Sequence, residues 1–128
     1  MGCRILIADD VVDMRYLWRM ILHEDPSLEV IGEASDGGEA LAAVEALRPD
    51  LLLLDLAMPG MDGLQVLRSV RARHPQTRVV VASAFAAERF EALVTELGAA
   101  GYFEKGNSGA ELRAMVRTAC DADRAQAS

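Results

Sequence analysis

The least common charged residue in this 128-residue sequence is lysine. Of thirteen basic residues, twelve are arginine and one, Lys105, is lysine, against twenty acidic residues. A general avoidance of lysine would explain the twelve arginines. Alternatively, position 105 requires a compact ammonium group that a guanidinium cannot replace. The composition alone leaves both interpretations open.

Positive charge is scarce as a whole, since the formal net charge is -7 at pH 7. A chain without a basic stripe binds nucleic acid poorly, because neutralised phosphates supply most of the non-specific affinity. We therefore expect no direct nucleic-acid binding. No apolar run reaches the roughly 18 residues of a membrane span, so we expect no membrane association. The first residues lack the apolar stretch of a signal peptide, which predicts a cytoplasmic protein.

Cysteine is nearly absent. The two cysteines, Cys3 and Cys120, are too few for a disulfide framework, and we expect buried thiols in a reducing compartment. The chain is 52% hydrophobic, which is typical of a globular protein, and its length is that of one domain. Such a domain buries about two-thirds of its unfolded surface and needs no metal or disulfide to fold. We assign residues 1–120 to this domain and 121–128 to a short polar tail.

Short apolar runs alternate five times with segments of helical periodicity. The expected strands are residues 5–8, 28–32, 51–54, 79–82 and 99–103. Leu17, Leu47 and Leu93 fall at helical spacing with other apolar residues, so we expect them to face the core. Alternation of this kind predicts an α/β fold, a doubly wound (βα)5 parallel sheet with helices on both faces.

Two capping boxes mark helix starts. Asp36 stands three residues before Glu39, and Ser108 stands three residues before Glu111. The first residue of each pair can accept a hydrogen bond from the backbone of the first helical turn, and the glutamate can reach back. We therefore expect helices to begin after Asp36 and after Ser108.

Polar residues follow four of the expected strands. Asp9 and Asp10 follow the first, Asp55 the third, Ser83 the fourth and Lys105 the fifth. In an open parallel sheet, ligands bind beyond the carboxyl ends of the strands. Each residue alone has a simpler explanation. The acids or the serine could cap helices or form turns, and the lysine could be a solvated loop charge.

Together these residues indicate phosphoryl chemistry. Clustered carboxylates repel one another and need protons or a cation, and Lys105 offers one positive charge. Mg²⁺ would add more and prefers oxygen ligands. We expect Asp55 to be the nucleophile, Asp10 to hold the metal directly, and Asp9 to hold it mostly through water. Ser83 and Lys105 would bind phosphoryl oxygens.

With these blocks in this order, the sequence resembles the receiver domain of response regulators in two-component signalling, over about residues 4–120. The matching motifs are Asp9-Asp10, Asp55 with Met58-Pro59-Gly60-Met61-Asp62-Gly63, Ser83-Ala84, and Gly101-Tyr102-Phe103-Glu104-Lys105. The resemblance implies a CheY-like, flavodoxin-like sheet of order 2-1-3-4-5. It also implies that a histidine kinase or phosphotransfer protein donates a phosphoryl group to Asp55. Mg²⁺, or Mn²⁺ in its place, would be bound by Asp10, Asp55 and the backbone carbonyl of Ala57, with Asp9 nearby.

The family also implies a switch. Phosphorylation would draw the Ser83 hydroxyl inward and turn Tyr102 from exposed to buried. The surface of the fourth helix, fifth strand and fifth helix would then change its preference for a downstream protein, and a phosphorylation-dependent dimer is one option. The resemblance thus implies a phosphorelay component that catalyses only its own phosphorylation and dephosphorylation.

The sequence departs from many family members after the lysine. Gly106 stands where they have a cis proline, so we expect no cis bond there. This feature is similar to receivers of LuxR-type regulators, but no DNA-binding domain follows here. The chain is therefore expected to be a free-standing receiver or one excised from a DNA-binding transcriptional regulator.

Three other classes of protein share features of this pattern. A flavodoxin-like nucleotide binder would carry a glycine- or hydroxyl-rich phosphate loop after the first strand, where this chain has acids. A phosphatase of the haloacid dehalogenase type would need a second aspartate at position 57, which is alanine. A degenerate receiver that binds proteins independently of phosphorylation would normally have lost one of the five site residues, and none is lost.

Overall fold

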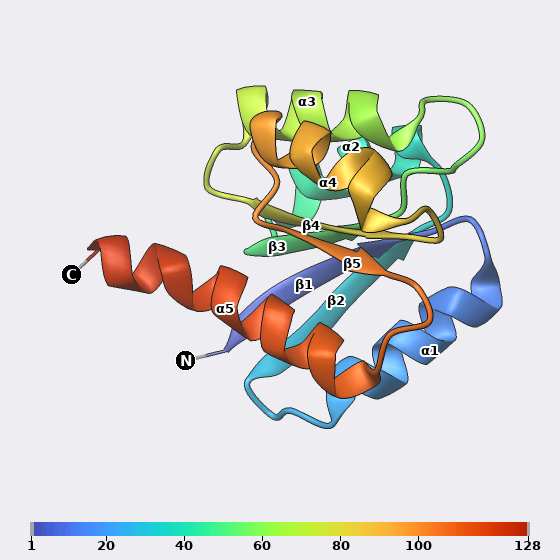
Figure 1. Cartoon of the computed structure of the whole chain (residues 1–128). Coiled ribbons are helices and arrows are strands. Elements are labelled where there is room, and N and C mark those ends of the chain that lie inside the picture. Colours follow the sequence, from blue (N-terminus) through green and yellow to red (C-terminus); the bar gives the residue numbers. More distant parts are fainter. Residues whose placement is uncertain (1, 128) are drawn as a thin grey trace.

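The computed structural model has one parallel sheet between two layers of helices (Figure 1). It describes the backbone of residues 2–127 and the side chains of residues 2–122. The strands are β1 (Cys3–Ala8), β2 (Leu28–Ala34), β3 (Leu51–Leu54), β4 (Arg78–Ser83) and β5 (Gly101–Glu104). The helices are α1 (Val12–His23), α2 (Gly37–Leu47), α3 (Gly63–Arg73), α4 (Ala87–Glu96) and α5 (Gly109–Ala127). The strand order is β2-β1-β3-β4-β5, which confirms the predicted topology.

The sheet separates two apolar cores. Helices α2, α3 and α4 cover one face, and α1 and α5 cover the other (Figure 1). The four leucines of β3 are at most 1% exposed, as expected of a strand buried on both faces. Trp18 of α1 meets Phe103 of β5 edge to face, with ring centres 6.0 Å apart. This packing fixes the strand ends from which the polar residues emerge.

The N-cap hydrogen bonds of both predicted capping boxes are present, and the reciprocal contact of the glutamate is present in the first. The Asp36 carboxylate accepts a hydrogen bond from the Glu39 N–H at 2.8 Å, and Glu39 reaches back to the N–H of Ser35 at 2.8 Å. The Ser108 hydroxyl accepts from the Glu111 N–H at 3.2 Å. Each interaction satisfies a backbone donor that the first helical turn leaves free. Helices α2 and α5 therefore begin where the sequence predicts.

The buried stripes of the helices are narrower than predicted. Leu17, Leu47 and Leu93 are 43%, 36% and 37% exposed, so the expectation that they face the core is wrong. In α1 the fully buried residues are Trp18 and Leu22. Leu17 lies about 100° around the helix from Trp18, which places it at the margin of the contact. Apolar spacing identified the helices correctly but overestimated the width of their buried faces.

The prediction of two free thiols is wrong. Cys3 and Cys120 form a disulfide, with Cα atoms 6.2 Å apart and a sequence separation of 117. Such a distance lies within the range that a disulfide spans. Composition cannot reveal this pairing, because it depends on α5 packing beside the first residue of β1. The fold brings them together because the Cys3 side chain points to the face of the sheet that α5 covers.

Helix α5 does not end at Cys120, where the polar tail was predicted to begin. Helix α5 continues through Ala127, while the side chains from residue 123 onward lie outside the described residues. Within residues 2–127, no helix has both the length and the apolar composition needed to cross a membrane.

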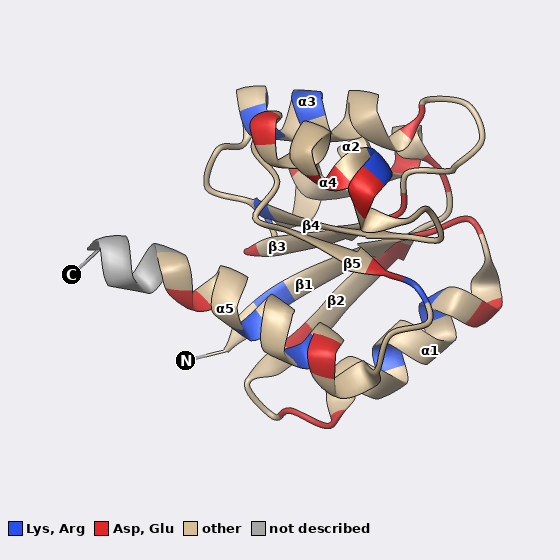
Figure 2. Cartoon of the chain, in the orientation of Figure 1, with Lys and Arg blue, Asp and Glu red and all other residues tan. Residues whose placement is uncertain are grey.

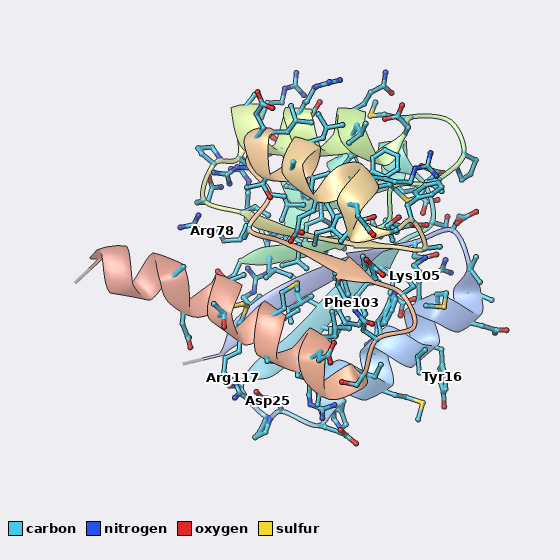
Figure 3. All side chains as sticks on the ribbon, in the orientation of Figure 1. Tyr16, Asp25, Arg78, Phe103, Lys105 and Arg117 are labelled. Carbon is cyan, nitrogen blue, oxygen red and sulfur yellow. A yellow bond between two sulfur atoms is a disulfide. The ribbon has the colours of Figure 1, made fainter. Side chains whose placement is uncertain are left out.

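A second link, formed by an ion pair, holds α5 near the start of the sheet. Arg117 donates two hydrogen bonds to Oδ2 of Asp25 in the loop between α1 and β2, where Figure 3 shows the two side chains side by side. Asp25 Oδ1 accepts from the N–H and the hydroxyl of Ser27 at 2.8 and 2.7 Å. These hydrogen bonds from Arg117 and Ser27 lower the pKa of Asp25 to about 2.

We expect this pair to make stability depend on acid pH. The pKa of Asp25 is lower in the folded than in the unfolded chain, so its contribution is complete above about pH 4 and disappears as the pH falls toward 2. Asp25→Asn should therefore lower the free energy of unfolding at neutral pH, with the difference from wild type shrinking over that window. Urea unfolding of both proteins across this range measures the difference. A difference independent of pH would contradict the assignment.

Candidate functional site

The carboxyl ends of β1 and β3 bring three carboxylates together. Asp9 and Asp10 follow β1 and Asp55 follows β3, and one oxygen from each lies within 4.8 Å of the others. Asp9 and Asp55 are only 1% and 5% exposed, whereas Asp10 is exposed. In Figure 2 the acidic loop after β1 and the basic segment after β5 lie at the same edge of the sheet. The structure therefore gathers the acids that the strand pattern predicted to converge.

Lys105 lies against these acids. Its Nζ is 2.8 Å from Oδ2 of Asp9 and 3.5 Å from Oδ1 of Asp55, and its side chain is 17% exposed. The neighbouring Gly106 has a φ of 105°, and no cis peptide occurs among the described residues, as predicted. One ammonium group faces three carboxylates, so the cluster keeps an excess of negative charge. This excess is the condition that favours a bound cation.

Asp55 is buried beside one positive and one negative group. Burial raises the pKa of its carboxyl above the usual range, Lys105 opposes this rise, and the Asp9 carboxylate adds to it. The Ala57 N–H donates to Oδ1 of Asp55 at 3.3 Å, and Lys105 approaches the same oxygen. Among the described residues, no hydrogen bond occupies the other oxygen, Oδ2. That oxygen is the one left for a reaction or a cation.

The donor set fits a hard divalent cation. Mg²⁺ is bound in proteins by one or two carboxylates and by water, and three carboxylates lie here. Both oxygens of Asp9 are already engaged, Oδ1 by the Val11 N–H at 2.9 Å and Oδ2 by Lys105. This supports the expectation that Asp9 reaches a metal through water and that Asp10 and Asp55 reach it directly. The predicted contribution of the Ala57 carbonyl stays a prediction.

Ser83 ends β4 and is 1% exposed. Its hydroxyl oxygen accepts a hydrogen bond from the Phe85 N–H at 3.1 Å, inside the loop before α4. The alternative that Ser83 caps α4 is not observed, because the residue at the cap position is Ala86. As an acceptor in this bond, the hydroxyl can still donate its own hydrogen to another oxygen.

Tyr102 differs from the expectation. The family resemblance places its ring outside until phosphorylation, yet here Tyr102 is 5% exposed and its hydroxyl donates to the Phe85 carbonyl at 2.7 Å. The ring therefore occupies the buried position that the resemblance assigns to the phosphorylated form. The hydrogen bond joins β5 to the loop between Ser83 and α4. Sequence could not predict this position, because the hydrogen bond depends on how that loop packs against β5.

Glu104 has a role that the strand and motif patterns did not predict. Its carboxylate accepts a hydrogen bond from the Ala87 N–H at 2.5 Å, at the first residue of α4. Helix α4 lacks a local capping side chain, because Ala86 stands at the cap position. A carboxylate at a helix N-terminus satisfies a free backbone donor and is favoured by the helix dipole. The absence of a capping residue before α4 was the sequence signal that its first turn leaves a backbone donor for a distant group.

Gly63 sets how closely α3 approaches Asp55. A Cβ atom there would lie 2.5 Å from the Asp55 carbonyl oxygen and 2.5 Å from the Leu56 Cα. Both are backbone atoms, so neither can move without shifting the loop. We expect Gly63→Ala to lower the free energy of unfolding by about 1–3 kcal/mol and to slow reactions at Asp55. Urea unfolding measures the change in the free energy of unfolding, and the rate at which Asp55 is modified by a reactive small molecule measures the second effect.

Gly38→Ala is the matched control for this prediction. Gly38 lies in the first turn of α2, and a Cβ there would meet only Oδ1 of Asp36, at 3.4 Å. Alanine favours a helix over glycine, so this variant should be as stable as wild type or slightly more stable. Equal losses in the two variants would show that Gly63 has no special role beside Asp55.

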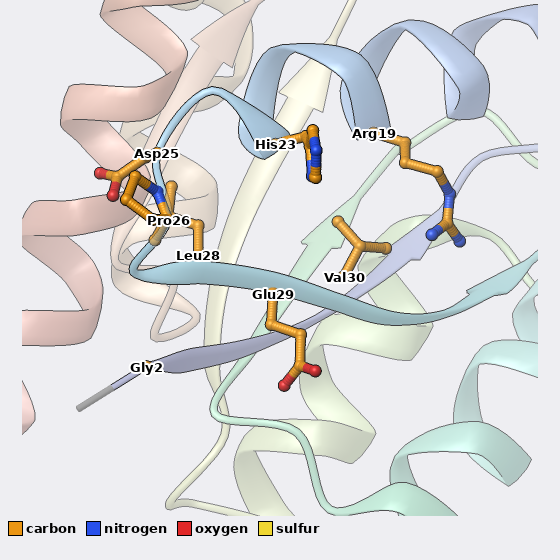
Figure 4. A pocket seen from close by; sticks show the side chains of 8 residues that line it. All are labelled: Gly2, Arg19, His23, Asp25, Pro26, Leu28, Glu29 and Val30. Carbon is orange, nitrogen blue, oxygen red and sulfur yellow. The ribbon is translucent and has the colours of Figure 1, made fainter.

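Two surface hollows lie away from the acidic cluster. One, of about 600 Å³, lies between the end of α1 and β2, where Arg19 and His23 face Val30 and Glu29 points to the other side of β2 (Figure 4). The other, of about 590 Å³, lies between α2 and α3 beside Glu45 and His74. Acids and bases are mixed in both. Neither contains one of the residues predicted to act at the strand ends.

Comparison with known proteins finds signalling domains. The family described as the response regulator receiver domain matches residues 5–117. The chain is 44% identical over 113 residues to protein-glutamate methylesterase/protein-glutamine glutaminase 2 of Koribacter versatilis, covering 85% of this chain and 30% of that protein. It is 34% identical over 114 residues to the response regulator GacA of Pseudomonas viridiflava, covering 89% and 53%. The chain thus spans about a third to a half of these relatives.

Solved structures agree with this similarity. The signal receiver domain of NarL from Mycobacterium tuberculosis superposes with a TM-score of 0.88 at 35% identity, over 94% of this chain and 97% of that one. The response regulator domain of CheB from Thermotoga maritima gives a TM-score of 0.85 at 28% identity, over 94% and 98%. In both cases nearly the whole of the compared domain has a counterpart here.

Proposed function

The chain belongs to the response regulator receiver domain family, and we propose that it accepts a phosphoryl group on Asp55. The donor would be the phosphohistidine of a histidine kinase or of a phosphotransfer protein. The observation that carries this proposal is the contact of Lys105 with both Asp9 and Asp55 in a cluster of three carboxylates. The complete set of predicted site residues argues against a receiver that has lost its chemistry.

In the proposed reaction, a carboxylate oxygen of Asp55 attacks phosphorus while the phosphorus–nitrogen bond breaks. The imidazole of the donor histidine leaves with the electrons of that bond. Lys105 and the Ser83 hydroxyl would bind the oxygens of the transferred group. Mg²⁺, held by Asp10, Asp55 and the Ala57 carbonyl, would supply positive charge beside those oxygens. Hydrolysis would reverse the modification, so the chain would act catalytically only on itself.

A small phosphodonor tests the proposal without a partner protein. The chain is incubated with acetyl phosphate and Mg²⁺, and its intact mass is measured. A gain of one phosphoryl mass supports the proposal. No gain on folded protein would favour a degenerate receiver that binds proteins independently of phosphorylation. Size-exclusion chromatography of the same samples shows whether phosphorylation produces a dimer.

The proposed output is a change in the surface formed by α4, β5 and α5. Ser83 and Tyr102 would be the switch residues. The Tyr102 ring is already buried here, and its hydroxyl donates to the carbonyl of Phe85, in the loop between β4 and α4, at 2.7 Å. A hydrogen bond from the Ser83 hydroxyl to the phosphoryl group on Asp55 would move this loop and the start of α4. The preference of the surface for an unidentified downstream protein would then change. A DNA-binding effector in a longer regulator would be one such target.

We further propose that the phosphohistidine partner docks on α1. Val12, Tyr16 and Met20 repeat every four residues along this helix and are 63%, 66% and 54% exposed. Figure 3 shows Tyr16 pointing away from the domain. The helix begins directly after the acids of the site, so a protein that brings a histidine to Asp55 must pass beside it. Its exposed apolar side chains fit an apolar helical surface flanking that histidine.

We expect Tyr16→Glu to slow phosphoryl transfer from a phosphorylated kinase or phosphotransfer protein by about tenfold or more, because a charge would enter an apolar contact. Uptake from acetyl phosphate should not change. Radiolabel transfer from the donor protein that phosphorylates wild type fastest measures the first rate. Leu93→Glu is the matched control, since Leu93 is an exposed apolar residue of α4 in the opposite helix layer. Equal effects of both variants would contradict docking on α1.

A further inference from the structure

The disulfide joins two elements from opposite ends of the described chain. Cys3 is the first residue of β1, and Cys120 lies in the C-terminal half of α5. The pair lies at the amino end of β1, whereas the acids follow its carboxyl end. None of the roles assigned to Asp55, Lys105 or Ser83 uses it. The cystine therefore needs a separate explanation.

The two cysteines are buried among apolar residues. Cys3 is 2% exposed and Cys120 is 7% exposed, in the core cluster that includes Val116 and Ala119 of α5. Thiols are themselves apolar and are often buried in protein cores. The same site can therefore hold the pair either as a cystine or as two thiols. The fold does not have to be rebuilt when the bond is made or broken.

A second contact, independent of the disulfide, also holds α5 beside the start of β1. Arg117, three residues before Cys120, binds Asp25, whose other oxygen accepts from Ser27. The Ser27 carbonyl in turn accepts from the Cys3 N–H at 2.7 Å. The start of β1 and the C-terminal half of α5 are thus joined by one covalent link and by a chain of hydrogen bonds. Reduction would remove the first link and leave the second.

We propose that Cys3 and Cys120 form a reversible redox clamp that sets how firmly the C-terminal half of α5 is held on the sheet. The oxidant is a low-molecular-weight disulfide of the glutathione type. The clamp does not depend on phosphoryl acceptance by Asp55. Its connection with signalling rests on the proposed function, in which α5 forms part of the output surface.

The exchange is balanced in two steps. The thiolate of Cys120, the more exposed cysteine, attacks one sulfur of glutathione disulfide. The bond between the glutathione sulfurs breaks, and one glutathione leaves and takes up the proton lost by Cys120. The thiolate of Cys3 then attacks the Cys120 sulfur and expels the second glutathione, which takes up the second proton. Two protein thiols are oxidised to one cystine, and one glutathione disulfide is reduced to two glutathione molecules.

The redox equilibrium is measured with the whole chain. Samples are equilibrated at graded ratios of glutathione to glutathione disulfide and quenched in acid. The free thiols are then alkylated with a maleimide, and the intact mass of the chain is measured. We expect two labels on the reduced chain and none on the oxidised chain, which should stay monomeric. Two labels at every ratio, or oxidation only into disulfide-linked dimers, would overturn the proposal.

Hydrogen exchange measured by mass spectrometry tests the structural effect. We expect exchange in the C-terminal half of α5 to be roughly tenfold or more faster in the reduced form, with β3 and β4 unchanged. In Cys120→Ser and Cys3→Ser, amide exchange in α5 should match that of the reduced wild type and should not depend on the glutathione ratio. Equal α5 exchange in the two forms of wild type would overturn the clamp. None of these measurements requires phosphorylation. They therefore test the clamp even if Asp55 accepts no phosphoryl group.

Discussion

Asp55→Asn should gain no phosphoryl mass from acetyl phosphate and Mg²⁺ under conditions that fully modify the wild type. An asparagine side chain keeps the size of the aspartate, but its amide is not a nucleophile toward phosphorus. The substitution also removes one of the three carboxylates of the cluster, and with it part of the negative charge that favours a cation. The loss should therefore be complete rather than partial. Intact-mass spectrometry of matched samples measures it directly.

Asp13→Asn is the matched control. Asp13 is an exposed acid in the first turn of α1, close in sequence to the cluster but outside it. The same change of charge at this position should leave phosphorylation intact. The fold of Asp55→Asn is checked by circular dichroism and urea unfolding. Because removing a buried charge can stabilise a protein, equal or higher stability together with lost phosphorylation is the expected pair of results. A phosphoryl adduct on folded Asp55→Asn would show that another residue is the acceptor.

We expect Lys105→Arg to lower the rate of phosphoryl uptake strongly, although it keeps the charge. The ammonium of Lys105 contacts Asp9 and approaches Asp55 at single oxygens, 2.8 and 3.5 Å away. A guanidinium is larger and tends to grip a carboxylate by both oxygens, which would occupy the reactive oxygen of Asp55. Lys105→Ala should be slower still, by about a hundredfold or more, because it removes a positioned charge that stabilises the transition state.

The two interpretations of the single lysine differ on this variant. If the chain merely avoids lysine, arginine at position 105 should be tolerated and the rate should match the wild type. Arg113→Lys, on α5 beside Glu24, makes the reverse exchange away from the acids and should have no effect. Rates from acetyl phosphate, followed by intact mass over time, separate the outcomes. A wild-type rate for Lys105→Arg would remove Lys105 from the proposed chemistry as a specific group.

The fold and the convergence of the acids were predictable because both follow from local patterns. Continuous apolar runs such as that of β3 indicate strands buried on both faces, and their alternation with helices dictates parallel pairing. Once the strands are parallel, Asp9, Asp55 and Lys105 must emerge at one edge. The sequence predicts that these residues meet, but the distances between them and the engagement of both Asp9 oxygens required the structure.

The features that sequence could not predict all depend on contacts between distant segments. The disulfide requires the first strand and the last helix to be neighbours across 117 positions. The buried ring of Tyr102 depends on how the loop before α4 packs, since its partner is the Phe85 carbonyl. The carboxylate that caps α4 comes from Glu104 on β5. In each case the residue type is visible in the sequence, and its partner is not.

The adjacency of Glu104 and Lys105 has an evolutionary consequence. Glu104 holds the first residue of α4, and Lys105, its neighbour in the chain, holds the acids at the strand ends. Two consecutive residues thus serve two separate networks, and any insertion or backbone rotation between them would disturb both. Insertions between these two positions should therefore be rare among related chains. Aligned sequences of related receiver domains test this expectation.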